Sequence, residues 1–380
     1  MTNIREKTAL LDKLILSNII IKDFKDFDKL VKKEIIEVSP TQIQYITASG
    51  KMFKRLLIDN DNLIDKMVAG SKVMGNKRVD YCNLSTTIKN SELGNLNCYT
   101  VNEYLEQLQK IKDHLEQKYG IIADFSNITI KELEINRTFQ LSHDFETYHR
   151  VLNLIMTNLP SYMKNQMDYK KINKGSSEYQ TYYATSKTTN KSKRYLLFKI
   201  YNKSKAVENI ILLTDSYMRV EFKLVSAEKI KKSLGTNKFL DLTDNSINSY
   251  FNSQIQKMIV QPFQKWKVDR DKYIIKLMQE QRLQDVRHWQ TNVLRILQNE
   301  EIAQKRPILL DIEEIILLVN KLDIKNNRKS DIKRNFRKQS IKYENVFCNR
   351  DDLKMNEILE KLVTKDDNKL PCIGGIPKTA

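Results

Sequence analysis

The chain has 380 residues, and its hydrophobic content of 41% is enough to form the cores of about two or three globular domains. Its 65 lysine and arginine residues outnumber the 47 acidic residues, so the formal net charge is +18. A field of this sign attracts polyanions and releases their counterions, which makes nucleic acid the predicted partner. An acidic membrane surface is the alternative that charge alone leaves open.

Several classes of protein and site are not expected. The sequence has no run of about 18 apolar residues, so no membrane span is predicted. The four cysteines form no C-x-x-C pair, which argues against a zinc ribbon or a disulfide framework and favours the reducing cytosol. No Walker-type phosphate loop is present, so any separation of DNA strands would need a separate helicase.

Five segments are predicted in chain order. Residues 1–98 mix strand-like runs with polar turns, and are either an α/β part of the core or a separate DNA-binding region. Residues 99–243 read as helix, strand, helix, strand, strand, helix. Residues 244–306 form a helical extension, residues 307–365 carry three short helices, and residues 366–380 are expected to be a disordered tail.

The order of elements in 99–243 predicts an α+β fold, with an antiparallel sheet that has helices on one face and an open polar face. Its first helix has the clearest boundaries, because Thr100 and Glu103 form a capping box and Gly120 can end the helix. A further helix is expected to begin at Ser226 and to end at Gly235.

Alternation along three predicted strands separates an apolar face from a polar face. In 194–203, 216–225 and 131–139, the apolar positions alternate with charged residues and a tyrosine. The polar set is Lys199, Tyr201, Lys203, Arg219, Glu221, Lys223, Glu132, Glu134 and Asn136. Antiparallel strands often have a polar solvated face, so a purely structural role remains the alternative.

The chemistry of this polar set favours an active site. A tyrosine has a pKa of about 10, and nearby cationic charge or a metal stabilises its phenolate. Lys199 and Lys203 supply such charge to Tyr201, while Glu134 and Glu221 could hold one Mg²⁺ or Mn²⁺ ion. Lys203 or Arg219 could stabilise a leaving 3′ oxygen or the phosphate itself. The predicted reaction is transfer of a DNA strand to tyrosine.

The run "TYYATSKTTNKSKRYLLFKIYNKSKAVE", followed by "YMRVEFKL", resembles the trans-acting rolling-circle replication initiators of Gram-positive plasmids and the related relaxases of conjugative elements. The family pattern is matched by Thr181, Tyr183, Ser186, Lys187, Tyr201, Lys203, Glu208, Arg219 and Glu221. The strand "ELEINRTF" corresponds to its acidic strand, with Glu134 as a metal ligand and Glu132 beside it. Lys199 stands where the pattern has arginine.

The resemblance covers roughly residues 125–235, and it implies a metal-dependent, site-specific endonuclease that nicks one strand at an origin. The enzyme would keep the 5′ phosphate on a tyrosine and release a 3′ hydroxyl for a polymerase. The partner would be origin DNA, single-stranded or hairpin at the nick site, together with a host helicase; a homodimer is one possible assembly. Residues 99–243 would then be the nickase core and residues 1–98 a candidate origin-binding region.

Two basic stretches are candidate DNA contacts. The first is a loop and strand with Lys187, Lys191, Lys193, Arg194 and Lys199, and the second is the predicted helix 328–340 with Arg334, Arg337 and Lys338. The three C-terminal helices favour either a helix-turn-helix-like DNA reader or a solvated helical cap.

The sequence leaves open both the function of the protein and the identity of the nucleophilic tyrosine. A sequence-specific DNA-binding protein without nickase activity competes with the enzyme, and replication competes with conjugative mobilisation. Tyr182 and Tyr183 are rivals to Tyr201. The four histidines form no His-hydrophobic-His motif, so the metal would depend on carboxylates.

Overall fold

The computed structural model describes residues 8–39, 43–87, 98–165, 181–186, 195–207, 214–302, 309, 311–343 and 351–363. The chain divides into two compact units. Unit 1 comprises Met1–Gln140 and Tyr162–Ser253, and unit 2 comprises Leu141–Ser161 and Gln254–Ala380. The predicted tail, 366–380, lies outside the described residues.

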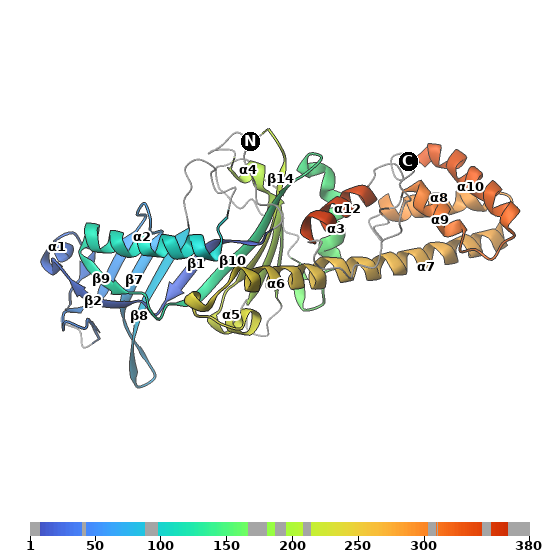
Figure 1. The fold of residues 1–380 in the computed structure, drawn as a ribbon. Coiled ribbons are helices and arrows are strands. Elements are labelled where there is room, and N and C mark those ends of the chain that lie inside the picture. Colours follow the sequence, from blue (N-terminus) through green and yellow to red (C-terminus); the bar gives the residue numbers. More distant parts are fainter. Residues whose placement is uncertain are drawn as a thin grey trace. The chain divides into compact units, whose positions relative to one another are not determined.

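Unit 1 is built on a large antiparallel sheet, which confirms the predicted α+β class (Figure 1). Ten described strands follow the order β11-β12-β13-β14-β10-β1-β8-β7-β6-β3. Their bounds are β1 Leu10–Ser17, β3 Ile36–Glu37, β6 Arg55–Asp59, β7 Lys66–Met74, β8 Lys77–Thr87, β10 Thr129–Gln140, β11 Met163–Asn165, β12 Thr181–Ser186, β13 Leu196–Asn202 and β14 Tyr217–Leu224. Strands from 1–98 and from 99–243 therefore share one sheet, and no boundary separates these two predicted segments.

Smaller elements complete unit 1. Two short strand pairs join β2 (Ile20–Phe24) to β9 (Ile121–Asp124) and β4 (Tyr45–Ile46) to β5 (Met52–Phe53). The helices are α1 Phe27–Lys32, α2 Val101–Tyr119, α4 Lys203–Val207, α5 Ala227–Leu234, the short η2 Phe239–Asp241, and α6 Asp244–Ile255, which ends two residues beyond the unit boundary.

Helix α2 has the ends that its sequence predicts. Thr100 and Glu103 form the capping box, and Gly120 follows the helix with a φ of 64°, a left-handed conformation that glycine adopts without strain. The Tyr104 hydroxyl donates a hydrogen bond to the backbone carbonyl of Asp12 in β1. This contact fixes the helix beside β1, the strand that carries Asp12.

The strand register confirms the alternation predicted for β10, β13 and β14. Ile135 lies opposite Phe222, which lies opposite Phe198, and the last two rings stack with centroids 5.1 Å apart. Phe251 of α6 packs edge-on against Phe222 at 5.4 Å. Helix α6 therefore covers the apolar face, and the polar side chains of the three strands share the other face.

Lys203 is an exception to the predicted pattern. Strand β13 ends at Asn202, and Lys203 is the first residue of α4 rather than the last residue of the strand. Its position on the polar side is therefore not set by strand alternation.

Unit 2 is helical over its described residues, as expected for the C-terminal part of the chain. It contains η1 Phe145–Tyr148, α3 His149–Thr157, the π-helical turn η3 Gln256–Val260, α7 Gln261–Gln284, α8 Trp289–Ile302, α9 Ile312–Val319, α10 Asn326–Ser340, η4 Ile341–Tyr343 and α12 Asp351–Leu362. Residues 141–161, predicted as part of the core, belong to this unit instead. None of the described helices is long and apolar enough to cross a membrane.

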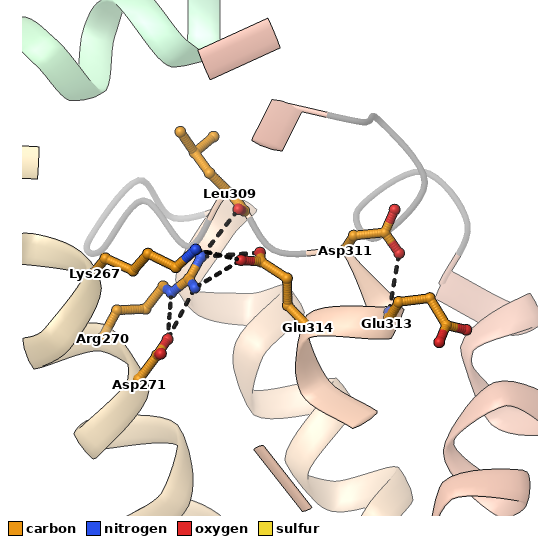
Figure 2. A network of polar contacts seen from close by, with 7 residues as sticks. All are labelled: Lys267, Arg270, Asp271, Leu309, Asp311, Glu313 and Glu314. Carbon is orange, nitrogen blue, oxygen red and sulfur yellow. Dashed lines mark hydrogen bonds and ion pairs between the residues drawn. The ribbon is translucent and has the colours of Figure 1, made fainter. Parts of the chain in front are cut away.

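Two kinds of contact hold the C-terminal helices of unit 2 together. An apolar core takes Ile274 from α7, Leu294 from α8, Ile315 from α9 and Phe336 from α10, each fully buried. Beside it, the buried Arg270 guanidinium of α7 contacts Glu314 of α9, as Figure 2 shows.

Candidate active site

Three carboxylates from neighbouring strands meet on the polar face of the sheet in unit 1. Asp12 of β1, Glu134 of β10 and Glu221 of β14 each offer an oxygen, and these oxygens all lie within 4.8 Å of one another. Strands β14, β10 and β1 are consecutive in the sheet. Of these three residues, strand alternation predicts that Glu134 and Glu221 lie close together.

Asp12 reaches the site through an irregularity in β1. The register with β10 shifts between Leu11 and Leu14, so the strand has one extra residue at Asp12 and Lys13. Sequence analysis missed this residue as a ligand candidate. The available signal was a carboxylate interrupting an otherwise apolar strand.

Each carboxylate has a cationic neighbour on the same face. The pairs are Asp12 with Arg219 at 2.9 Å, Glu134 with Lys223 at 2.9 Å, and Glu221 with Lys199 at 2.5 Å. The Arg219 side chain is fully buried, and that of Glu221 is only 3% exposed. These pairs compensate charge that burial would otherwise make costly.

Tyr201 lies beside this group. Its hydroxyl donates to Glu221 Oε2 at 3.4 Å, and its backbone lies opposite Arg219 in the strand register. Burial raises the pKa of the phenol well above its ordinary value of 10.0, although the charge of Arg219 acts in the opposite direction. In the protein without a bound ion, desolvation therefore outweighs the effect of the basic neighbours on this pKa, and Lys199 is paired with Glu221.

Lys203 and Glu134 also have shifted pKa values. Burial, followed by the charge of Arg219, lowers the pKa of Lys203 from 10.5 to about 8. Burial, followed by repulsion from Glu221, raises the pKa of Glu134. A bound cation would relieve the second effect, since it would offset the crowding of negative charge.

The donor set fits a hard divalent cation. Mg²⁺ and Mn²⁺ prefer carboxylate oxygens, and Asp12, Glu134 and Glu221 supply three. Glu132 is not in this group; its carboxylate pairs with Lys223 at 3.1 Å. The structure therefore favours Asp12 over Glu132 as the third candidate ligand.

The register also separates the rival tyrosines. Tyr183 lies opposite Lys199 and shares the polar face, whereas Tyr182 lies opposite Ile200 on the apolar face and is buried. Only Tyr183 remains on the same face as Tyr201.

Only some of the predicted DNA-contacting residues lie in the described part of the chain. Lys187, Lys191, Lys193 and Arg194 lie outside the described residues. In α10, Arg334 pairs with Asp331 at 2.9 Å, and Arg337 donates two hydrogen bonds of 2.9 Å to Glu313 of α9. Lys338 is exposed.

Comparison with known proteins assigns no family to the chain. No family model matches it, and no curated protein matches it. Among solved structures, it is similar to a rolling circle replication initiator protein from Geobacillus stearothermophilus, with a TM-score of 0.28 and 10% identity over 66% of this chain and 85% of that one.

A second similarity is to the apo immunity protein TplEi of T6SS from Pseudomonas aeruginosa, with a TM-score of 0.17 and 10% identity over 58% of this chain and 83% of that one. The structure of that protein complexed with "L" peptide has a TM-score of 0.16 and 9% identity, over 57% of this chain and 81% of that one. Scores this low assign neither a fold nor a function to the chain.

Proposed function

We propose that this protein nicks a single DNA strand and holds the cut end on Tyr201, as a replication initiator or a relaxase does. One observation carries the proposal: the Tyr201 hydroxyl lies 3.4 Å from Glu221, whose carboxylate belongs to the acidic group with Asp12 and Glu134. The sequence resemblance implies a tyrosine nucleophile at the same residue. A nucleophile beside a set of hard oxygen ligands suits phosphoryl transfer.

The reaction can be written with the residues present. The Tyr201 oxygen attacks phosphorus and forms the new P–O bond, while the bond from phosphorus to the 3′ oxygen breaks. Glu221 is within reach of the phenol proton, and Lys203, with a pKa of about 8, can give a proton to the leaving 3′ oxygen. When bound at the three carboxylates, Mg²⁺ or Mn²⁺ would neutralise charge on the phosphate and favour the phenolate.

For Arg219 we propose a different role from the predicted contact with phosphate or the leaving oxygen. Its guanidinium is fully buried and donates to Asp12 and to Thr138 Oγ1 at 2.8 Å. We assign it to positioning Asp12, since a fully buried group cannot also touch DNA without rearrangement.

Unit 2 would supply duplex binding. Helices α9 and α10 follow one another across a short turn, pack on α8 and α7, and expose basic side chains on α10. This arrangement suits a helix-turn-helix reader in which α10 meets the DNA.

The decisive experiment detects the covalent adduct. The protein is incubated with Mn²⁺ and a pool of random-sequence single-stranded DNA oligonucleotides, and the modified residue is identified by mass spectrometry. We expect a nucleotide on Tyr201, loss of the adduct in Tyr201→Phe, and its retention in the matched control Tyr183→Phe. An adduct that persists in Tyr201→Phe contradicts the proposal, as does the absence of any adduct in the unaltered protein.

A second candidate is a DNA-binding protein without nickase activity. The observation that favours it is the pairing of all three carboxylates with Arg219, Lys223 and Lys199, which leaves the polar face compensated without a metal. Binding of Mn²⁺, measured by calorimetry, separates the two candidates. Undetectable binding at millimolar Mn²⁺, together with intact duplex binding, would favour the second.

A further inference from the structure

The hairpin formed by β7 and β8 extends beyond the sheet of unit 1 as a two-stranded ribbon (Figure 1). On one side, β6 pairs with β7 only as far as Gly70; on the other, β1 pairs with β8 only from Leu84 onward. Within the described part of the chain, the residue pairs from Ser71–Asp80 to Met74–Lys77 pair with no third strand of the sheet. We call residues 71–80 the arm.

The arm has local contacts that give it a defined shape. Gly75 turns the chain with a φ of 61° at the first of two loop positions, which suits a tight hairpin turn. The Ser71 hydroxyl donates to Asp80, and Arg78 pairs with the same carboxylate at 3.3 Å. At the base, the Tyr81 ring lies over Gly70, where a Cβ atom would approach the Tyr81 hydroxyl to 3.0 Å.

The side chains of the arm combine cationic and apolar character. Val73, Met74 and Val79 are 54%, 58% and 38% exposed. Lys72, Lys77 and Arg78 outnumber the single acidic residue Asp80, so the arm has a formal charge of +2. An exposed ribbon with apolar residues costs solubility unless it has a partner.

We propose that the arm enters the major groove of duplex DNA. A two-stranded ribbon fits this groove, which is about 12 Å wide and about 8.5 Å deep. Four residue pairs project beyond the sheet, or about 13 Å at about 3.3 Å per residue, enough to reach the base edges. Lys72 and Lys77 meet phosphates, and the apolar residues at the tip contact the bases.

Charge argues against a second copy of this chain as the occupant. Two arms brought together would oppose their +2 charges, whereas a duplex carries about one negative charge per 1.7 Å of its axis. The proposal extends the proposed function by giving the protein a contact with the duplex within unit 1, and its test does not require strand cleavage.

The first measurement is the affinity for a random-sequence 30-base-pair duplex at several salt concentrations. The double variant Lys72→Gln/Lys77→Gln should bind more weakly, with a salt slope smaller by up to about two units, at about 0.9 per lost phosphate contact. The matched control is Lys54→Gln/Lys66→Gln, which removes the same charge from lysines that pair with Glu37 and Asp59. Equal effects of the two double variants would overturn the proposal.

The second measurement locates the arm. A photoreactive benzophenone amino acid placed at Met74 should crosslink to the duplex, whereas the same group at Met52, another exposed methionine of unit 1, should not. Crosslinking at Met74 to a second protein chain, or no crosslink to DNA, would contradict the proposal. Because these measurements use uncleaved duplex, loss of the Tyr201 adduct would leave them unaffected, and the two proposals can fail separately.

Discussion

Arg219 of β14 and Asp12 of β1 form an ion pair of 2.9 Å. The pair spans β10, which lies between those two strands in the sheet. The two residues are 207 positions apart in sequence. The buried arginine also donates to Thr138 of β10, so three strands contribute to a single contact. This pair holds Asp12 beside Glu134 and Glu221.

The first prediction is that Asp12, and not Glu132, binds the divalent ion. Asp12→Asn keeps the size of the side chain but removes its charge, and should weaken Mn²⁺ binding at least about 10-fold, the effect of losing even an outer-shell partner. Glu132→Gln makes the same chemical change 3.1 Å from Lys223 and outside the acidic group, so its effect should be small. Calorimetric titration measures both affinities; equal losses would show that the group is not a discrete site.

The strand faces were predictable from sequence because alternation in a sheet is strict. Phe198, Ile200 and Phe222 are buried, while Lys199, Tyr201 and Glu221 meet on the other face, as expected. The capping box of α2 was predictable for a similar reason, since its contacts are local.

The features that sequence analysis missed depend on long-range structure. Asp12 reaches the acidic group through a bulge, and a bulge breaks the alternation on which the prediction depends. The raised pKa of Tyr201 depends on burial by the whole fold, which composition does not give. Assignment of 141–161 to unit 2 likewise requires contacts with distant helices; Tyr148, for example, donates to Glu357.

The second prediction concerns pH and Lys203. Its pKa in the folded protein, about 8, lies below its ordinary 10.5, so between these values the unfolded chain keeps a proton that the folded chain has lost. The free energy of unfolding should therefore rise between pH 8 and 10.5, by at most about 3 kcal/mol. Below pH 8 the full cost of burying the charge is present.

Lys203→Met should remove this rise and make the protein more stable at pH 7. The matched control is Lys205→Met, because Lys205 is exposed in the same short helix. Urea unfolding followed by circular dichroism at several pH values measures the difference. The same pH dependence in Lys203→Met and the unaltered protein would show that another group causes it.

The third prediction separates the basic residues of α10. Arg328 and Lys338 are exposed, and within the described part of the chain neither side chain forms an ion pair, whereas Arg337 is held by Glu313 of α9. Arg328→Gln/Lys338→Gln should weaken duplex binding and lower the salt slope by up to about two units. Arg337→Gln should change the slope less, since its guanidinium already has two hydrogen bonds. Equal slopes for all variants and the unaltered protein would favour the solvated helical cap.

The last prediction concerns the network around Arg270 in Figure 2. The Arg270 side chain is 4% exposed; its guanidinium donates to the Leu309 carbonyl at 3.2 Å and pairs with Asp271 and Glu314. Arg270→Met leaves these acceptors without their main donor, and should lower the free energy of unfolding of unit 2 by about 3–5 kcal/mol.

The double variant Arg270→Met/Glu314→Met should recover part of that loss, because it also removes the unpaired carboxylate. Both tryptophans of the chain, Trp266 and Trp289, lie in unit 2, and the Arg270 guanidinium is 5.0 Å from the Trp266 ring centroid. Tryptophan fluorescence during urea unfolding therefore reports on this unit directly. Two results would contradict the prediction: a cost of less than about 1 kcal/mol for Arg270→Met, or a double variant no more stable than the single one. Either result would mean that the buried arginine does not join α7 to α9 through its charge. Packing of Ile274, Ile315 and Phe336 would then account for the association of the two helices.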